Sequence, residues 1–573
     1  MGPRAARFYL SGVSQTVTHT NIERLFTGTD GELRHGWEGL QADTAVARGA
    51  VSLYTAGVSN LGLNVIHLIV LANLLPTQEI GVLTGANILI AGYATVVGLA
   101  LPQAVLKYVS DYAARHYVYA IGRLVWLALR VTFATATPVA VLMYVYAGPL
   151  AAALFGSETQ VLVIQLAAID AWLFVVSQVL LALLFGLNRI PKASGILIVG
   201  AVLRFAIAVG LVIAGLRLPG AFQGYVIGDA ALLTLTLYAT RRSLLTVPHA
   251  SDPPIPTMKL LSYSLPLVVA GLVIFAITQL DKIYIWFYPI LGTGQPPALS
   301  GLAIYNIAAA ASVYVLGGAS IAAYAPNAVT VALIPSLSPL SDQEAREEFV
   351  KLAKKYTRYV SLVAIPTAFG LAALSSPLVL LFGPQYLRAA LPAAIMALAV
   401  GVTAVSAVYV SQLMARRKTG AIMYANLVGL LAFFAALTIL VPLLEFEGAA
   451  WARAIMTVVS AVTLALYVYR EGVFVFDRRA FGSALVASAI MGLLLFTLTT
   501  LIGGYRLQLA ALPVLVPLGV TVYFLALRFL RAFTLDDFDF LVRLLPARLR
   551  AVVSFLAKLA GVRAEQAATR VQA

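Results

Sequence analysis

Long apolar segments alternate with short polar ones along almost all of the 573 residues. Many of the apolar segments reach the roughly 20 residues that a helix needs to cross about 30 Å of hydrocarbon. The pattern therefore predicts an all-α polytopic membrane protein. A transmembrane β-barrel would instead show segments of about 10 residues in which apolar and polar positions alternate.

Fourteen membrane spans are predicted, most of them joined by short loops. The eighth is expected to be a broken helix, because apolar character continues through Pro326 and Pro335 to about residue 339. The spans cover about residues 50–74, 81–106, 121–147, 159–186, 193–215, 219–240, 262–288, 299–325, 357–381, 389–414, 420–442, 448–469, 481–502 and 507–530.

The two halves of the chain repeat one another. Pro149–Gly156 has the pattern P-L-x-x-x-L-F-G, and Pro377–Gly383 has the pattern P-L-x-x-L-F-G. The offset from Pro149 to Pro377 is typical of the duplication of a whole bundle, because solenoids repeat about every 20–50 residues. The sequence thus predicts two pseudo-symmetric six-helix bundles plus two extra helices, with a site between the bundles. Further pairs share this offset or fall within one position of it: Gly220-Ala221 and Gly448-Ala449, Leu237-Tyr238 and Leu466-Tyr467, and Arg241 and Arg470.

Positive charge falls on one side of the predicted spans. Of 39 Lys and Arg residues, 32 lie in the termini and in the loops of one side, whereas the opposite loops hold Arg217, Arg388 and Arg506. Because Lys and Arg stay in the cytoplasm, both termini are predicted to be cytoplasmic and the protein to be a multi-pass protein of the cell membrane. The net charge of +15 is then mostly a topology signal and indicates no nucleic-acid partner. The repeated segments Pro149–Gly156 and Pro377–Gly383 both fall at the outer ends of predicted spans, where we interpret them as turns between equivalent helices.

Six regions follow from this organisation. Residues 1–46 lack a charged-then-apolar signal sequence, so no cleaved leader is expected. Residues 547–561 are basic and amphipathic, which suits either a helix on an anionic inner leaflet or a solvated tail. The regions are an N-terminal cytoplasmic extension (1–46), a first six-helix bundle (47–242), a cytoplasmic linker (243–261), a second six-helix bundle (262–470), transmembrane helices 13 and 14 (471–531) and an amphipathic cytoplasmic tail (532–573).

The composition narrows the chemistry. Charged residues make up 11% of the chain, against about 25% in soluble proteins, and 61% of the residues are hydrophobic. The chain has no Cys, which excludes disulfides and thiol catalysis, and its five His residues form no zinc-binding pattern. We expect no catalytic residue, no metal site and no cofactor.

Seven charged residues lie inside predicted spans. Each costs at least about 2.5–3.5 kcal/mol at the bilayer centre unless it is paired or hydrated, so these side chains should face a cavity or each other. In the functional interpretation, the cations bind an anionic head group and the acids bind a coupling ion. The cations are Arg130, Arg204, Lys282 and Arg453, and the acids are Asp170, Asp229 and Asp281.

Structural interpretations of the same residues stay open. Asp170 or Asp229 pairs with Arg204 merely to neutralise charge, or Lys282 and Arg453 snorkel to the outer interface. His67 is a further polar candidate. Four asparagines suit a sugar, or else serve as hydrogen-bonding glue between helices. They are Asn60, Asn64, Asn87 and Asn306.

Several local patterns, taken together, resemble the polysaccharide-exporter (O-antigen-flippase-like) branch of the multidrug/oligosaccharidyl-lipid/polysaccharide (MOP) exporter superfamily. They are Leu265-Pro266 followed by Gln279–Lys282, Gly301–Asn306, Leu381–Tyr386 and Thr534–Asp537. The resemblance covers about residues 45–545. It implies two six-helix bundles that face each other across a central cavity, and alternating access for a polyprenyl-(pyro)phosphate-linked saccharide.

The favoured function is therefore transport, not catalysis: a flippase that moves a lipid-linked saccharide from the inner to the outer leaflet. Arg130, Arg204, Lys282, Arg453 and Asn306 are its predicted substrate-binding residues. The expected partners are the lipid-linked saccharide, the bilayer and a coupling cation, either proton or sodium, and a monomer suffices. The alternatives are a cation-coupled multidrug exporter of the same fold, a membrane glycosyltransferase or polymerase and, last, a scaffold without transport.

Overall fold

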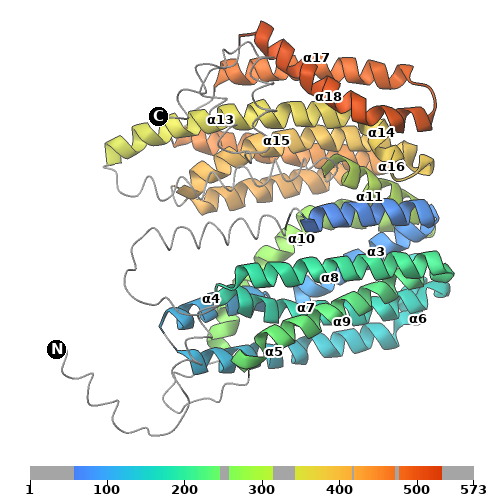
Figure 1. The fold of residues 1–573 in the computed structure, drawn as a ribbon, viewed down its shortest axis with the longest axis vertical. Helices are drawn as coiled ribbons and strands as arrows, with labels where there is room; N and C mark the ends of the chain where they lie inside the picture. Colours follow the sequence, from blue (N-terminus) through green and yellow to red (C-terminus); the bar gives the residue numbers. More distant parts are fainter. Residues whose placement is uncertain are drawn as a thin grey trace.

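The computed structural model describes residues 57, 59–115, 117–244, 257–313, 342–415, 418–471 and 477–531, and every regular element within them is helical (Figure 1). The helices of the first half of the chain occupy one half of the molecule and those of the second half the other. The expected extension 1–46, the prolines at 326 and 335 and the C-terminal tail lie outside the described residues.

The first bundle contains six spans. Its second span is broken at Leu99 and Ala100, which both have positive φ, and a short helix follows its third span. The elements are the helix Ser59–Leu74, α3 (Thr77–Val97) with α4 (Leu101–Ala114), α5 (Val118–Val145), α6 (Ala147–Phe155), η1 (Glu158–Gln160), α7 (Val161–Gly186), α8 (Ile190–Leu211) with η2 (Val212–Leu216), and α9 (Arg217–Leu244).

The second bundle repeats this plan, and two further helices pack on it. The eighth predicted span is represented by α11, because its later part lies outside the described residues. The elements are α10 (Thr257–Thr293), α11 (Leu299–Val313), α13 (Asp342–Ala373), α14 (Ser375–Leu380), η4 (Pro384–Ala389), α15 (Ala390–Ala415), α16 (Thr419–Arg470), α17 (Arg478–Leu501) and α18 (Tyr505–Phe529).

Two long apolar stretches, Ile190–Arg241 and Thr419–Arg470, each contain two spans. Each turns back at residues with positive φ, Gly215 (φ 95°) and Arg217 (φ 49°) in the first and Glu445 (φ 50°) in the second. The turn in α16 brings Ser460 Oγ within 3.4 Å of the carbonyl oxygen of Ala425. With these two hairpins separated, each of the fourteen predicted spans has a helical counterpart, so the predicted all-α fold is confirmed.

The two repeated segments, predicted as turns, are short helices that each end at or near a glycine and connect two spans. In the first, α6 ends at Gly156 (φ 68°), and in the second Gly383 (φ 121°) separates α14 from η4. Both glycines adopt backbone conformations that a residue with a Cβ rarely adopts. We call Pro149–Gly156 and Pro377–Gly383 the first and second LFG turns, and the end of the molecule where they lie the LFG end (right in Figure 1).

One helix connects the two bundles along its length. Near its start, α10 packs on α4 of the first bundle, where Tyr108 and Tyr263 make an edge-to-face contact with ring centroids 5.7 Å apart. Further along, α10 contacts α3 of the first bundle and α11 and α16 of the second. Figure 1 shows it running obliquely between the two halves.

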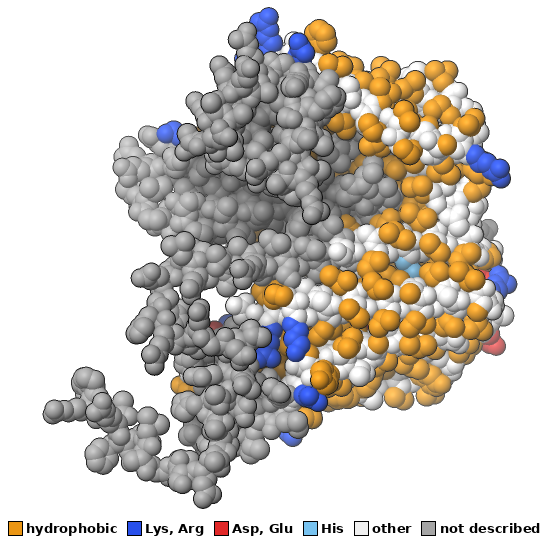
Figure 2. All heavy atoms as spheres, viewed as in Figure 1, with side chains coloured by type: hydrophobic (Ala, Val, Ile, Leu, Met, Phe, Trp, Pro, Cys, Tyr) orange, Lys and Arg blue, Asp and Glu red, His pale blue; other side chains and the backbone are white. Residues whose placement is uncertain are grey.

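The described surface suits a bilayer. Hydrophobic side chains cover the flanks of the helices, and most Lys and Arg side chains on the face in Figure 2 lie toward the helix ends. Large apolar residues such as Val145 (67% exposed) and Leu493 (69%) remain mostly exposed on these flanks. Lipid hydrocarbon is the environment that such flanks require.

Candidate functional site

A cavity of about 660 Å³ lies between the bundles. The first bundle contributes the helix Ser59–Leu74, α3, α7, α8 and α9, and the second contributes α10 and α11. The repeat predicted a site in this position. The polar and charged side chains that line it are Asn60, Asn64, His67, Asn87, Gln178, Arg204, Tyr225, Asp229, Gln279, Lys282 and Asn306.

Arg204 binds two carboxylates in the wall formed by the first bundle. Its Nη1 lies 2.9 Å from Oδ2 of Asp229, and its Nη2 lies 3.0 Å from Oδ2 of Asp170. The Asp170 side chain is fully buried, whereas that of Arg204 is 20% exposed toward the cavity it lines. The guanidinium also lies over the ring of Tyr225, 4.4 Å from its centroid. The partly exposed guanidinium of Arg204 is thus paired with two buried carboxylates.

Glycines on α9 allow this close approach. A Cβ on Gly228 would overlap the Cα atom of Arg204, and one on Gly224 would overlap the Cα atom of Ala208. Hydrogens in place of side chains let α8 and α9 pack backbone to backbone, as in other small-residue helix contacts. The G-x-x-x-G-x-x-x-G pattern beginning at Gly220 is the sequence signal that could have placed Arg204 beside Asp229.

His67 extends this polar wall. Its Nε2 lies 2.7 Å from the hydroxyl of Tyr225, and its ring stacks on Phe205 with centroids 4.4 Å apart. Three buried polar atoms at or beside the cavity have no protein partner among the described residues. They are Nδ1 of His67, Oδ1 of Asp170 and Oε1 of Gln279. Such atoms are free to meet a ligand, a proton or water.

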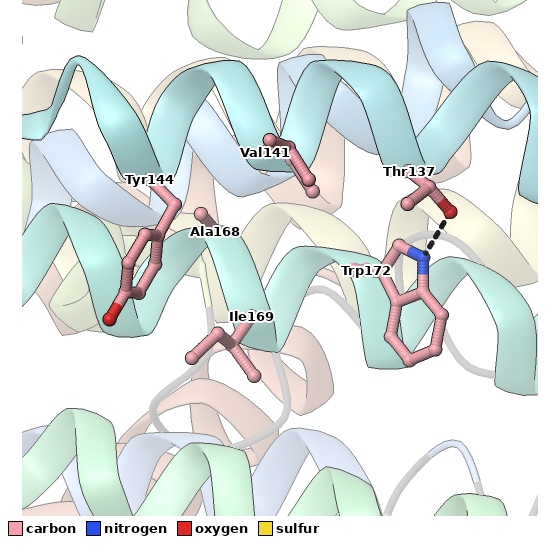
Figure 3. A pocket seen from close by; sticks show the side chains of 7 residues that line it. Thr137, Val141, Tyr144, Ala168, Ile169 and Trp172 are labelled. Atoms are coloured by element: carbon pink, nitrogen blue, oxygen red, sulfur yellow. Dashed lines mark hydrogen bonds between the residues drawn. The ribbon is translucent and has the colours of Figure 1, made fainter.

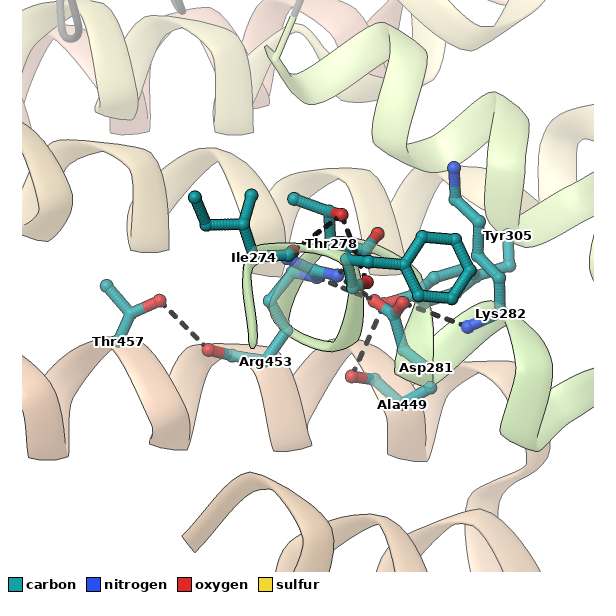
Figure 4. Close-up of polar contacts among 9 residues, drawn as sticks. Ile274, Thr278, Asp281, Lys282, Tyr305, Ala449, Arg453 and Thr457 are labelled. Carbon is teal, nitrogen blue, oxygen red and sulfur yellow. Dashed lines mark hydrogen bonds and ion pairs between the residues drawn. The ribbon is translucent and has the colours of Figure 1, made fainter. Parts of the chain in front are cut away.

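A second ion-pair cluster lies inside the second bundle (Figure 4). Oδ2 of Asp281 accepts hydrogen bonds from Nε of Arg453 at 2.6 Å and from the hydroxyl of Tyr305. Its Oδ1 accepts a hydrogen bond from the backbone N–H of Lys282 at 2.9 Å. Asp281 and Tyr305 are fully buried. Both carboxylate oxygens are therefore engaged, and the cluster joins α10, α11 and the second half of α16.

The structure separates the predicted site residues into those that line the cavity and those that lie outside it. Lys282 and Asn306 line the cavity with Arg204 and Asp229. Arg453 does not line it and does not reach the interface by snorkelling, because its guanidinium is bound to Asp281. Arg130 lies on an exposed face of α5, outside the cavity. The sequence interpretation paired Arg204 with either Asp170 or Asp229 to neutralise charge, and in the structure Arg204 pairs with both.

Sequence reasoning missed the aromatic partners. Tyr225 and Tyr305 each contact one ion-pair cluster, and although Tyr305 lies in the motif Gly301–Asn306, neither was named as a site residue. The repeat does carry a signal, because Tyr225 and Arg453 are separated by the same offset as the repeated prolines, and so are Phe205 and Phe433. Arg453 lies over the Phe433 ring at 5.5 Å, so both bundles place a polar cluster at equivalent positions.

A smaller hollow of about 200 Å³ lies between α5 and α7 (Figure 3). Its one side-chain hydrogen bond joins Nε1 of Trp172 to Oγ1 of Thr137 at 3.1 Å. Val141, Tyr144 and Ile169 line it and are exposed on the flank of the bundle. Because it holds no charged side chain and lies within the spans, we regard it as a lipid-facing groove.

Comparison with known proteins identifies the family. A sequence profile of polysaccharide biosynthesis proteins matches residues 46–341, more than half of the chain. The chain belongs to the polysaccharide biosynthesis protein family. Membership agrees with the resemblance drawn from Gln279–Lys282 and the other motifs. No curated protein matches this family member in sequence.

Solved structures with the same fold belong to the MOP superfamily. The lipid II flippase MurJ, in an inward closed conformation, has a TM-score of 0.62 at 15% identity, over 84% of this chain and 99% of MurJ. The MATE transporter VcmN of Vibrio cholerae has a TM-score of 0.51 at 12% identity, over 80% and 100% of the two chains. A MOP superfamily transporter from Pyrococcus furiosus gives 0.50 at 14%, over 75% and 95%. This polysaccharide biosynthesis family member is thus a multi-pass membrane protein with the MOP transporter fold.

Proposed function

We propose that the chain moves a polyprenyl-(pyro)phosphate-linked saccharide from the inner to the outer leaflet of the cell membrane by alternating access. The observation that carries the proposal is the cavity between the bundles, which has Arg204 on one wall and Lys282 on the other. Moving an anionic head group through hydrocarbon is the main energetic barrier, and two cations facing the same cavity offset that cost. Membership of a polysaccharide biosynthesis family supports this substrate class.

The uncharged polar lining suits a sugar. Amide side chains both donate and accept hydrogen bonds, so a set of them matches the hydroxyl groups of a saccharide without requiring charge. Gln279 has its Oε1 atom free of protein partners among the described residues, ready to accept from a hydroxyl. The amides lining the cavity are Asn60, Asn64, Asn87, Gln178, Gln279 and Asn306.

Lys282 is the proposed first ligand of the phosphate. Its Nζ points away from the Asp281 cluster in Figure 4, and no ion pair joins it to a carboxylate among the described residues. Its ammonium is therefore available on the cavity wall, unlike the guanidinium of Arg204, which already binds two carboxylates. Arg204 would bind the same anion by exchanging one of its two carboxylates for phosphate, since a guanidinium binds either group with similar geometry.

That exchange provides a route to coupling. Asp170 and Asp229 share one guanidinium, and two neighbouring carboxylates that lose a cation cannot both stay ionised at low cost. Phosphate binding at Arg204 would then be accompanied by proton uptake at this pair, for which the free Oδ1 of Asp170 is available. Asp281, a third predicted coupling residue, has both oxygens engaged, so we assign it a structural role and propose the proton as coupling ion.

The proposed cycle needs one chain. The two pseudo-symmetric bundles would rock about the cavity, with both termini in the cytoplasm as the distribution of Lys and Arg predicts. The lipid tail would remain in the bilayer while the head group passes between the bundles. A monomer therefore contains both bundles and the binding site between them.

The experiment that tests this function uses purified protein in proteoliposomes. A fluorescent polyprenyl-pyrophosphate-linked oligosaccharide is placed in one leaflet, and its arrival in the other is followed with and without a proton gradient. The proposal predicts transfer above the rate of protein-free vesicles. Transfer should be faster when the side that the saccharide leaves is the more acidic, because proton uptake accompanies binding there, and a sodium gradient should have no effect. Transfer equal to that of protein-free vesicles would refute it.

A cation-coupled multidrug exporter is the second candidate, and the buried pair Asp170 and Asp229 favours it. Such an exporter would bind organic cations at these acids, whereas here Arg204 already occupies both. Proton-driven efflux of a lipophilic cation from the same proteoliposomes, together with no saccharide transfer, would favour this candidate over the flippase.

A further inference from the structure

The two LFG turns each contact the opposite bundle through the same backbone atom. The carbonyl oxygen of Leu154, in the first turn, accepts a hydrogen bond from Nε1 of Trp286 on α10 at 2.8 Å. The carbonyl oxygen of Leu381, in the second turn, accepts one from Nδ2 of Asn73 at 2.9 Å. Leu154 and Leu381 are the leucines that precede Phe-Gly in the two copies of the motif. The duplicated sequence thus makes a reciprocal pair of contacts across the bundle interface.

The first contact is tightly packed. The ring of Trp286 stacks on that of Phe155 with centroids 5.5 Å apart and is 1% exposed. It lies against Gly85 of α3, where an added Cβ would come within 2.8 Å of the indole. One turn away, a Cβ on Gly81 would overlap the carbonyl oxygen of Leu299. Two glycines four residues apart therefore form the seat for α10 and α11 on α3.

The second contact has an additional hydrogen bond. Nε2 of Gln385, just after the second LFG turn, donates to the carbonyl oxygen of Ala72 at 3.0 Å. Phe382 and Tyr386 around it are fully buried. Two hydrogen bonds therefore hold the end of the helix Ser59–Leu74 to the second bundle. The side chain of Asn73 donates one, and the side chain of Gln385 donates the other.

These contacts lie between the cavity and the LFG end. On the helix Ser59–Leu74, the cavity is lined from Asn60 to Leu68, and the contacts follow at Ala72 and Asn73. On α10 the cavity is lined by Gln279 and Lys282, and the contact follows one turn later at Trp286. α11 gives the same order, because Leu299 packs on α3 while Asn306 and Ala310 line the cavity.

We infer that the two LFG turns form a reciprocal latch that closes the cavity toward the LFG end, and that releasing both contacts is the step that opens it there. The inference concerns the conformation of the protein and holds whatever molecule is transported. It also explains why the motif occurs twice: the pseudo-two-fold relation between the bundles turns one closing contact into two. Opening requires Trp286 to move away from Gly85 and Phe155. It also requires the side chains of Asn73 and Gln385 to break their hydrogen bonds to backbone carbonyl oxygens of the opposite bundle.

The test measures the opening directly. The chain has no Cys, so spin labels attach only at introduced cysteines. Leu162→Cys on α7 and Leu387→Cys on η4 put one label on each bundle at the LFG end, at side chains that are 44% and 50% exposed. Pulsed electron–electron double resonance of the labelled protein in nanodiscs without substrate then gives the distribution of distances between the two labels.

The latch variants are Trp286→Phe, which keeps an aromatic ring and removes the N–H donor, and Gln385→Leu. Each should raise the ratio of long-distance to short-distance populations about fivefold, and the double variant about 25-fold, as the loss of one and two ordinary hydrogen bonds implies. The matched control is Thr137→Val, which removes the acceptor of the Trp172 hydrogen bond within the first bundle and should leave the distribution unchanged.

A second label pair distinguishes rocking of the bundles from local loosening. Lys192→Cys on α8 and Thr419→Cys on α16 report on the opposite end, where both positions are exposed. In the latch variants this distance should shorten as the LFG-end distance lengthens. An unchanged LFG-end distribution would overturn the proposal, and so would a longer LFG-end distance with no change at the opposite end.

Discussion

Arg217 and Glu445 occupy equivalent positions of the repeat and have nearly the same unusual backbone conformation, with φ and ψ of 49° and −142° in one and 50° and −129° in the other. Each ends the first helix of a hairpin in its own bundle. Residues with a Cβ rarely adopt this region, because it is sterically accessible mainly to glycine. That the same strained turn occurs at both repeat positions indicates that the duplication preserved backbone geometry as well as sequence pattern.

Glu445→Gly is therefore expected to stabilise the protein. It removes strain of about 1–3 kcal/mol, against an entropic cost of glycine of about 0.5–1 kcal/mol, for a net gain on the order of 1 kcal/mol. The ion pair lost with Arg388 is 3.8 Å long between exposed side chains and contributes little. The measurement is the thermal unfolding midpoint in detergent. Glu447→Gly, two residues on within helical backbone, is the control and should lower the midpoint.

Arg204→Ala should destabilise the protein as well as stop transport. It leaves the buried carboxylates of Asp170 and Asp229 without their cation, and removing one partner of a buried ion pair costs about 3–5 kcal/mol. Adding Asp170→Asn and Asp229→Asn to Arg204→Ala should restore most of the thermal midpoint, because neutral amides no longer need a counter-charge.

Saccharide transfer separates the two effects of Arg204. The restored triple variant should still fail to move the lipid-linked saccharide, since the anion site is gone. A triple variant that is both stable and active would show that Arg204 serves only to neutralise its two acids, which is the structural interpretation that the sequence left open.

The sequence was a sufficient guide to the architecture. Span length and the long internal repeat predicted two related six-helix bundles and two further helices, because hydrocarbon thickness and duplication act on long stretches of chain. The LFG turns were recognised as connections between spans but not as the short helices α6 and α14. Their role as contacts between bundles depends on Trp286 and Asn73, far away in the chain. The break at Leu99 and Ala100 within the second span was also not predicted, although Gly98 and Pro102 flank it.

The site was harder to predict because helices that are apolar all round do not reveal which face points inward. Arg204 and Arg130 look alike in sequence, each a lone cation in an apolar span, yet one lines the cavity and the other is exposed on α5. The partner of Arg453 is Asp281, far earlier in the chain, and only packing of α10 on α16 brings them together.

Asp281 is expected to behave as a structural residue. Asp281→Asn should lower the thermal midpoint, because it leaves the Arg453 guanidinium without its buried counter-charge. A double-mutant cycle with Arg453→Gln measures the coupling, which should be at least about 1 kcal/mol for groups in direct contact. The effect of Asp281→Asn on transport should be the same with a proton gradient and without one. Loss of the gradient-driven acceleration alone would instead identify Asp281 as a coupling residue.

Acid should loosen the docking of α17 on α13. Burial alone would raise the pKa of Asp477, but the backbone N–H of Ala480 and the guanidinium of Arg358 outweigh it and hold the pKa below its ordinary value of 3.8. A carboxyl with a lowered folded-state pKa contributes stability that is complete above the unfolded-state pKa and is lost as pH falls through the folded-state pKa. The difference in unfolding midpoint between the native protein and Asp477→Asn should therefore be constant above about pH 5 and shrink below about pH 4. A difference that persists unchanged at pH 3 would contradict this assignment.

Lys282→Gln should weaken substrate binding without weakening the fold. Its ammonium has no carboxylate partner among the described residues, so its removal leaves no buried charge unpaired. Loss of one charge-assisted hydrogen bond to phosphate is worth about 1.5–3 kcal/mol, so the KM for a pyrophosphate-linked saccharide should rise roughly 10- to 100-fold. Lys282→Arg should retain most of the activity because it keeps the charge. Arg130→Gln is the matched control: it removes an exposed cation from a membrane span outside the cavity and should leave KM unchanged. If instead Arg130→Gln raised KM and Lys282→Gln did not, the anion site would lie on the outer face of α5 and not in the cavity between the bundles.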